Sequence, residues 1–203
     1  MPLPESEDSE LHAALGGQFD RQTIVTVIVV VEALFLLITT VWSYFAQIDL
    51  RHLFRFNWSA LIWGLSAGMA ISASNLALLY LCQKWNRFFI FQSMHDLLKK
   101  EMMPLFGRLT IVDSILVSLA SGICEEIFFR GILETTGGIA LSATCFGLAH
   151  LPSFYYFPYA IWALLVGLVM SFVMSGSGSI IAPIVAHALV NFISINVLRY
   201  IKN

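Results

Sequence analysis

The chain has 203 residues, of which 58% are hydrophobic and 12% are charged, and its mean hydropathy is +0.80. An ordinary soluble domain carries about 25% charged residues, so this composition indicates an integral membrane protein. The formal net charge is −2, so the chain lacks the excess of basic residues that is typical of nucleic-acid-binding proteins, and we expect no nucleic-acid partner. The three cysteines, Cys82, Cys124 and Cys145, lie in apolar runs without a Cys-x-x-Cys pair, which is typical of small buried side chains rather than disulfides or a metal framework.

Residues 1–21, MPLPESEDSELHAALGGQFDR, form a polar and acidic segment at the start of the chain. A secretory signal peptide begins basic and soon turns apolar, so this segment predicts a loosely ordered tail instead. Two apolar runs follow, at 23–46 and 59–82, and the first is interrupted only by Glu32. A helix needs about 20 apolar residues to cross the hydrocarbon core, so each run predicts one membrane span.

Residues 83–109 connect the second predicted span to the third and are too polar to cross a membrane. Aromatic and leucine side chains alternate there with Lys84, Arg87, Lys99, Lys100 and Arg108. This pattern predicts an amphipathic helix that lies in the membrane interface, with its basic side chains reaching water. Residues 22–109 are therefore expected to form a unit of two transmembrane helices and one interfacial helix.

Residues 110–203 contain four further apolar runs, at 111–133, 138–151, 157–174 and 179–198. Turn signals separate these runs, namely TTGG at 135–138, LPS at 151–153 and SGSG at 175–178. We therefore expect a four-helix core in this part of the chain. The whole protein is predicted to be all-α and polytopic, with about six transmembrane helices and an interfacial amphipathic helix.

The distribution of basic residues favours a cytoplasmic location for both termini. With the N-terminus inside, the cytoplasmic segments hold eight Lys and Arg residues, whereas the outer segments hold only Arg51 and Arg55. Cytoplasmic loops of membrane proteins carry the excess of Lys and Arg, which supports this orientation. The remaining basic residue, Arg130, falls within a predicted span.

Three polar patches interrupt the predicted spans of the core. They contain Glu125, Glu126 and Arg130, then Phe146 and His150 in FGLAH, then His187 and Asn191 in HALVN. Each patch has two members spaced i, i+4, which share a helix face. At 1.5 Å per residue, the three patches lie about 15 Å from the same membrane surface. A charge at that depth costs about 2.5–3.5 kcal/mol even on lenient scales, so this convergence indicates a functional site.

The two glutamates of the first patch are expected to differ in their partners and in their roles. Glu126 and Arg130 are four residues apart and can pair, and pairing is how buried charges are retained. Glu125 points about 100° away from Glu126 on a helix and remains an unneutralised acid, which makes it a candidate general base. Each patch alone has a structural explanation, such as a hydrogen bond between helices or a local ion pair. The common depth of all three favours a site.

The three motifs resemble those of the CPBP family of intramembrane proteases, which includes the type II CAAX prenyl proteases and bacterial relatives. The family pattern is EExxxR, then FxxxH, then HxxxN or HxxxD on successive core helices. The corresponding residues here are Glu125, Glu126 and Arg130, then Phe146 and His150, then His187 and Asn191. The resemblance covers about residues 110–198, and it implies that the 110–203 segment is a catalytic core of CPBP type.

By this resemblance, Glu125 and His150 would activate a water molecule for attack on a peptide carbonyl, and His187 and Asn191 would stabilise the oxyanion. Glu126 and Arg130 would hold the geometry of the site. The implied function is an intramembrane endopeptidase of the glutamate type that acts on a protein or peptide substrate, lipidated or not. No cofactor is expected, because HExxH is absent and asparagine is a poor zinc ligand. The alternative is a Zn²⁺ site formed by Glu125, His150 and His187.

Two functions of other classes stay open at the level of sequence. The first is a non-enzymatic immunity or binding protein of the same fold. The second is a small transporter that relays protons through buried glutamate and histidine. For the protease, the substrate could be a CAAX-type protein, a bacterial precursor or a sorting tail. The short chain and compact loops favour a location in the bacterial inner membrane.

Overall fold

The computed structural model describes residues 20–202 and is helical in all its regular elements there. The predicted polar tail, residues 1–21, lies outside the described residues apart from its last two. These two residues begin the first described helix, α2 (Arg21–Ala46), where the carboxylate of Asp20 accepts a hydrogen bond from the Thr23 backbone N–H at 2.8 Å. Such a cap satisfies one of the backbone donors that a helix leaves free at its start.

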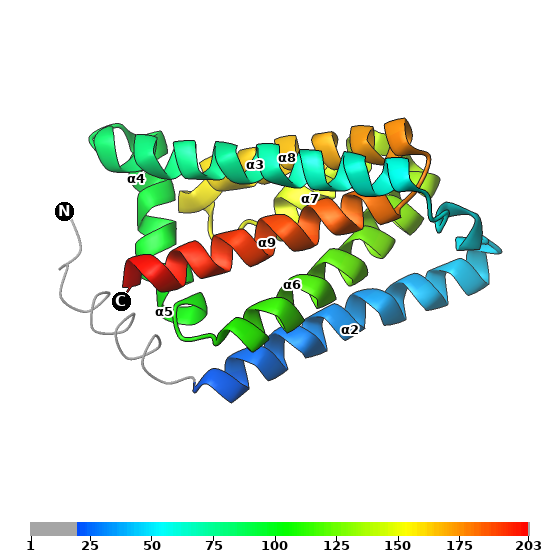
Figure 1. The fold of residues 1–203 in the computed structure, drawn as a ribbon, viewed down its shortest axis with the longest axis horizontal. Helices are drawn as coiled ribbons and strands as arrows, with labels where there is room; N and C mark the ends of the chain where they lie inside the picture. Colours follow the sequence, from blue (N-terminus) through cyan, green and yellow to red (C-terminus); the bar gives the residue numbers. More distant parts are fainter. Residues whose placement is uncertain (1–19, 203) are drawn as a thin grey trace.

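Six long helical segments form the body of the part that the structure describes (Figure 1). They are α2, α3 (Trp58–Lys84), α6 (Ile111–Glu126) with its π-helical continuation η3 (Ile127–Leu133), α7 (Glu134–Ala149), α8 (Phe157–Ser177) and α9 (Ile181–Lys202). They correspond to the six predicted spans. Among the described residues, four helices are long and apolar enough to cross a membrane, at Arg21–Ala46, Trp58–Lys84, Phe154–Ser177 and Ile181–Ile201.

The chain reverses direction where the TTGG turn was predicted, although α7 begins before it. Within α7, Gly138 has φ 81° and ψ 170°, which is a non-helical conformation that glycine adopts without a steric penalty. Beyond the reversal, the Ser142 hydroxyl donates a hydrogen bond to the Phe129 carbonyl at 2.7 Å. The last part of α7 therefore packs back along η3 and brings its C-terminal end toward the middle of the bundle.

The long segments alternate in direction between two ends of the bundle. At one end Arg21, at the start of α2, pairs with Asp113 at the start of α6, with an N–O distance of 2.8 Å. At the other end the Ile180 N–H donates to the carbonyl of Leu53 at 3.0 Å, where η1 (Arg51–Leu53) approaches the start of α9. Arg51 and Arg55 thus lie at the opposite end from the eight basic residues expected to be cytoplasmic.

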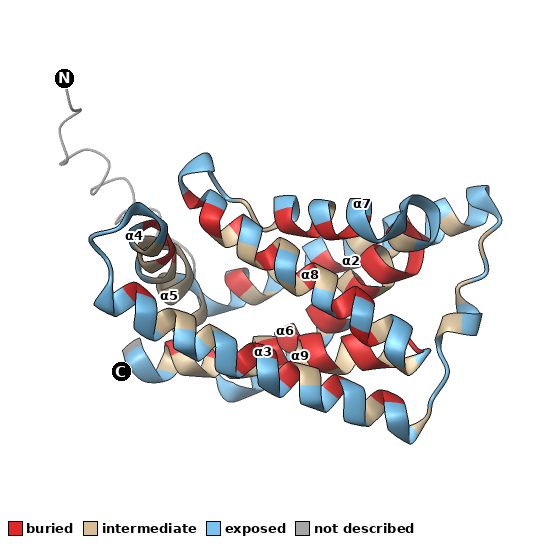
Figure 2. Ribbon diagram, turned by 90° about the horizontal axis from the view of Figure 1, so that it is seen from above, coloured by how far each residue is buried: buried red, intermediate tan, exposed pale blue. Residues whose placement is uncertain are grey.

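Helix α9 occupies the centre of the bundle, between α3 and α6, while α2 covers the outer side of α6 and α7 pairs with α8 (Figures 1 and 2). The close approach of α6 to α9 depends on Gly122. A Cβ atom added there would lie 2.9 Å from the backbone nitrogen of Ala188, a distance that real Cβ contacts do not reach. This contact sets the separation of the two helices beside His187.

The outer surface of the bundle is apolar, as an integral membrane protein requires. On α2, Val27, Leu37 and Phe45 are exposed by 54%, 57% and 78%, whereas only Ile24, Glu32 and Thr39 are buried. Figure 2 shows buried and exposed positions alternating along the helices, with exposed positions on the outside of the bundle. Large apolar side chains that face outward on a helix of this length are stable in lipid and not in water.

The segment predicted to lie in the membrane interface, called the interfacial segment below, forms three short helical pieces, α4 (Phe89–Asp96), the π-helical η2 (Leu97–Met102) and α5 (Met103–Phe106). They lie across one end of the bundle (Figure 1). Met94 and Leu97 are buried, while Lys99 and Lys100 are exposed, so the segment is amphipathic. Tyr155 and Tyr156 of η4 (Phe154–Tyr156) donate hydrogen bonds to Asp96 at 2.9 Å and to Glu101 at 3.2 Å, respectively.

Candidate active site

The centre of the candidate site is the carboxylate of Glu126, which is fully buried. Its Oε1 atom lies 3.1 Å from Arg130 Nη1 and 2.7 Å from His187 Nδ1. Arg130 is also fully buried, and His187 is almost so. The predicted pairing of Glu126 with Arg130 is therefore present, and the same oxygen also bonds a side chain from α9. A buried charge that is paired and hydrogen-bonded in this way can be retained inside the bundle.

Arg130 extends this network to two further helices. Its Nη2 donates a hydrogen bond to the carbonyl oxygen of Gly167 on α8 at 3.0 Å. Its guanidinium carbon lies 4.5 Å from the ring centroid of Phe146 on α7, which is a cation–π contact. A side chain at Gly167 would crowd both groups, since an added Cβ would lie 3.4 Å from Nη2 and 3.3 Å from the Phe146 ring. Arg130 thus holds η3, α7 and α8 together.

The helix that carries these residues changes its winding directly after Glu126. Residues 127–133 form η3, a π-helix that contains Arg130. π-Helical turns are rare and occur frequently at functional sites. The change of winding was not predicted by the i, i+4 spacing, which assumed one regular helix over residues 111–133.

Phe146, from the FxxxH motif, lies between the two imidazoles. Its ring centroid is 4.4 Å from that of His150 and 5.8 Å from that of His187. His150 directly follows the last residue of α7, and its Nδ1 lies 2.8 Å from the Phe146 carbonyl oxygen. A carbonyl oxygen only accepts, so Nδ1 of His150 carries the proton and Nε2 is left as a proton acceptor. By the same reasoning, Nδ1 of His187 donates to the Glu126 carboxylate.

Glu125 lies beside this network and not in it. It is partly buried, and it interacts electrostatically with His187 and with Tyr159 on α8. The hydrogen bonds of Arg130 go to Glu126 and Gly167 instead. The Glu125 carboxyl group also interacts electrostatically with that of Glu32 on α2. The two adjacent glutamates therefore occupy different surroundings, as their positions on the helix predicted.

Asn191 connects α9 to α6 one turn beyond His187. Its Nδ2 donates a hydrogen bond to the hydroxyl of Ser121 at 2.6 Å. One N–H of the amide is used in this contact, and the other stays free for a further acceptor. The residue also lines the cavity described next, so a structural contact and a position at the site coincide in one side chain.

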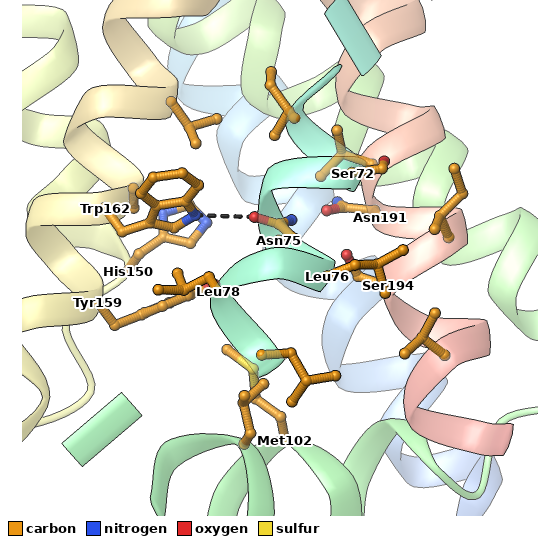
Figure 3. Close-up of a pocket in the computed structure, with 18 of the residues that line it drawn as sticks. Ser72, Asn75, Leu76, Leu78, Met102, His150, Tyr159, Trp162, Asn191 and Ser194 are labelled. Atoms are coloured by element: carbon orange, nitrogen blue, oxygen red, sulfur yellow. Dashed lines mark hydrogen bonds between the residues drawn. The ribbon is translucent and has the colours of Figure 1, made fainter. Parts of the chain in front are cut away.

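A cavity of about 160 Å³ adjoins the two imidazoles and Asn191. Figure 3 shows His150, Tyr159 and Trp162 on one side of it and Asn191 and Ser194 on the other, with Asn75 of α3 between them. Trp162 Nε1 donates to Asn75 Oδ1 at 3.0 Å. The rest of the lining is largely apolar, and Met94, Leu98 and Met102 of the interfacial segment also line it.

Sequence reasoning missed three of these residues, Asn75, Tyr159 and Trp162. Asn75 gave a usable signal, because it is an amide in an otherwise uncharged apolar run. Tyr159 and Trp162 gave none, since aromatic residues are common at the ends of membrane spans. Their partners come from other helices and could not be read from local spacing.

The alternative zinc site would be formed by Glu125, His150 and His187. Among residues 20–202, no group of three or more His, Cys, Asp and Glu side chains is placed to hold a metal ion. A structural or catalytic zinc site needs at least three protein ligands that converge within bonding distance. In this conformation the three predicted ligands do not fit such a centre.

A buried network of glutamate, arginine and histidine inside an apolar helical bundle defines a polytopic membrane protein with a polar intramembrane site. Residues 107–193 match the family described as type II CAAX prenyl endopeptidase Rce1-like. Over these residues the chain is similar to that family, which confirms the resemblance expected from the motifs. Comparison with curated proteins and with solved structures gave no match.

The matched region contains all six predicted site residues. It spans α6, η3, α7, α8 and the first half of α9, whereas α2, α3 and the interfacial segment lie outside it. The description of the matched family is that of an endopeptidase.

Proposed function

We propose that this protein is an intramembrane endopeptidase of the glutamate type, in which Glu125 and His150 activate a water molecule. The observation that carries the proposal is the Glu126 oxygen that bonds both Arg130 and His187, because it fixes residues of separate motifs into one buried unit. The family of the 107–193 domain supports peptide-bond hydrolysis as the reaction. The roles of single residues follow from their hydrogen bonds.

His150 is suited to accept a proton from water. Its Nδ1–H is held by the Phe146 carbonyl, so in the neutral ring Nε2 is the nitrogen that can accept a proton. Glu125 is not held by Arg130, and its carboxylate is free to accept a proton or to orient the water by a hydrogen bond. General-base assistance of this kind typically contributes a factor of about 10²–10⁴ in rate.

His187 and Asn191 are suited to stabilise the oxyanion that forms on the attacked carbonyl. An imidazolium at His187 can donate from Nε2 to that oxygen while the Glu126 carboxylate holds its Nδ1–H. Asn191 has a second amide N–H beyond the one that it donates to Ser121. Preorganised donors of this type are each worth roughly 2.7–4 kcal/mol in acyl transfer.

The substrate we propose is a membrane-associated protein or peptide, lipidated or not. The cavity beside the imidazoles is largely apolar and has room for an apolar side chain or part of a lipid chain. A CAAX-type protein, a bacterial precursor and a sorting tail all satisfy this chemistry. We further propose that all six long segments cross the bilayer, with both termini in the cytoplasm, in a bacterial inner membrane.

The test of the proposed function compares the termini of membrane proteins in cells that carry the wild-type chain or Glu125→Gln. New N- or C-termini that depend on Glu125 would identify substrates, and the cleavage of one of them by purified protein would establish the enzyme. An immunity or binding protein would generate no such termini.

A proton relay is a second candidate, and one observation favours it. Glu32, Glu125 and His187 interact in series across α2, α6 and α9, as the members of a relay must. Proton flux into liposomes that contain the purified protein, and its loss in Glu125→Gln, would support this function.

A further inference from the structure

Asn75 is a polar side chain in the cavity wall that the proposed mechanism does not use. It lies on α3, in the uncharged stretch 58–83, outside the region that matches the protease family. Its side chain lines the cavity that also adjoins His150 and Asn191 (Figure 3). Amides within membrane helices commonly bond a neighbouring helix, and Asn75 does so by accepting a hydrogen bond from Trp162 on α8. That bond uses only part of the hydrogen-bonding capacity of the amide.

The bond to Trp162 fixes which way the amide of Asn75 is turned. An indole Nε1–H only donates, so the atom that accepts it at 3.0 Å must be Oδ1. The Nδ2 group is therefore the end of the amide that is turned away from Trp162 (Figure 3). Its two N–H donors have no acceptor among residues 20–202. Trp162 thus holds two hydrogen-bond donors in place at the cavity wall.

The chemistry of the cavity matches a peptide segment that carries one apolar side chain. Most of the lining is apolar, with Ile71, Leu79 and Val190 among the residues that form it. The volume of about 160 Å³ is close to that of apolar protein cavities that hold one benzene molecule, so a single leucine or phenylalanine side chain fits. Donors in such a place are costly unless the ligand brings an acceptor. A peptide carbonyl is such an acceptor, whereas a hydrocarbon chain has none.

We propose that Asn75 is a substrate-binding residue, which donates a hydrogen bond from Nδ2 to a peptide carbonyl of the substrate. The apolar wall of the same cavity receives the side chain next to that carbonyl. This proposal rests on the proposed function, since the cavity adjoins the imidazoles of His150 and His187. Trp162 is the positioning residue, because it holds Oδ1 and so directs Nδ2. Selection of the substrate thereby depends on α3, which lies outside the matched region.

The first experiment measures cleavage by the full-length chain in detergent for the wild type, Trp162→Phe, and the double variant Asn75→Leu with Trp162→Phe. The double variant removes both partners of the hydrogen bond, so it leaves no unpaired group that would disturb folding. A contact that is equal in the substrate complex and the transition state changes KM and not kcat. KM should rise about threefold in Trp162→Phe and about tenfold further in the double variant, with kcat within about threefold of wild type.

Ser74→Ala is the matched control on the same helix. Ser74 is exposed on the outside of α3, where its hydroxyl donates to the Ala70 carbonyl at 2.9 Å. Its replacement should leave both constants unchanged. Equal KM values in Trp162→Phe and the double variant, or a loss confined to kcat, would overturn the proposal.

A binding measurement keeps the test independent of proteolysis. The probes are N-acetyl-L-leucinamide, which has peptide carbonyls and an apolar side chain, and N-acetylglycinamide, which has the carbonyls alone. Saturation-transfer NMR in detergent, with protein-free micelles as background, reports the binding of each probe. The leucine probe should bind the wild type, and it should bind the double variant about tenfold more weakly than Trp162→Phe. The glycine probe should bind far more weakly than the leucine probe to all three proteins.

The outcomes separate this proposal from the proposed function. Equal binding of the leucine probe to Trp162→Phe and to the double variant would overturn the role of Asn75, whatever reaction the protein catalyses. Binding of the glycine probe as tight as that of the leucine probe would overturn the apolar subsite. The expected binding pattern in a protein that cleaves nothing would support the binding site and overturn only the proposed function.

Discussion

The Oε1 atom of Glu126 accepts a hydrogen bond from Nδ1 of His187 at 2.7 Å, although the two residues are 61 positions apart in the chain. The same oxygen bonds Arg130, so one atom joins α6, η3 and α9. Glu126 is therefore placed to hold these helices together, whereas the proposed function gives Glu125 the role of the base. The following predictions test this division of roles and the packing that makes it possible.

Glu126→Gln should destabilise the protein. The substitution leaves Arg130 fully buried without its counter-ion, and loss of one partner of a buried pair costs about 3–5 kcal/mol. Yield and melting temperature in detergent should fall, and activity should be lost as a consequence. The double variant Glu126→Leu with Arg130→Met removes both charges and should recover melting temperature but not rate. A melting temperature for Glu126→Gln equal to that of the wild type would show that Arg130 has another counter-ion.

Gly122→Ala should force α6 away from α9. The added Cβ would meet the backbone of Ala188 at 2.9 Å, and a backbone contact cannot yield as a flexible side chain can. Overpacking of this kind typically costs about 1–3 kcal/mol, and it should also lengthen the Glu126–His187 bond and lower the rate.

Gly131→Ala is the matched control for this change, since its added Cβ would meet no atom closer than 3.5 Å. It should melt within a few degrees of the wild type. Equal losses of melting temperature and cleavage rate in Gly122→Ala and Gly131→Ala would mean that the separation of α6 and α9 does not determine stability or activity.

Chelators should leave the activity intact if Glu125 and His150 act without a metal. Purified active protein would be incubated with EDTA and with 1,10-phenanthroline, and its zinc content would be measured by elemental analysis. We expect full activity and no stoichiometric zinc. One zinc ion per chain, together with loss of activity on its removal and recovery on its return, would restore the metal-dependent mechanism.

The sequence predicted the helical segments well because membrane spans are set by the length of apolar runs. It also predicted the Glu126–Arg130 pair, since that contact is local and follows from the i, i+4 geometry. The common depth of Glu125, His150 and His187 pointed to one layer. In the structure Glu125 interacts with His187, and the Phe146 ring contacts both imidazoles.

Contacts between residues far apart in the chain could not be predicted from the sequence. The bond between His187 and Glu126, the hydrogen bond of Asn191 to Ser121 and the approach of Glu32 to Glu125 all depend on how helices pack. The π-helix η3 was not predicted either. Its residues are compatible with an α-helix, and its π-helical winding depends on tertiary contacts. For the same reason the cavity between α3, α8 and α9 has no signature in the sequence.

The central claim is that Glu125 is the base, and the most direct measurement is the cleavage rate of purified Glu125→Gln beside its melting curve. Glutamine keeps the shape and hydrogen bonding of the side chain but cannot accept the proton. We predict a fall in kcat of about 10²–10⁴-fold at an unchanged or higher melting temperature. A Glu125→Gln protein that cleaves at the wild-type rate, or one that unfolds while Glu126→Gln melts normally, would contradict the assignment of the two carboxylates.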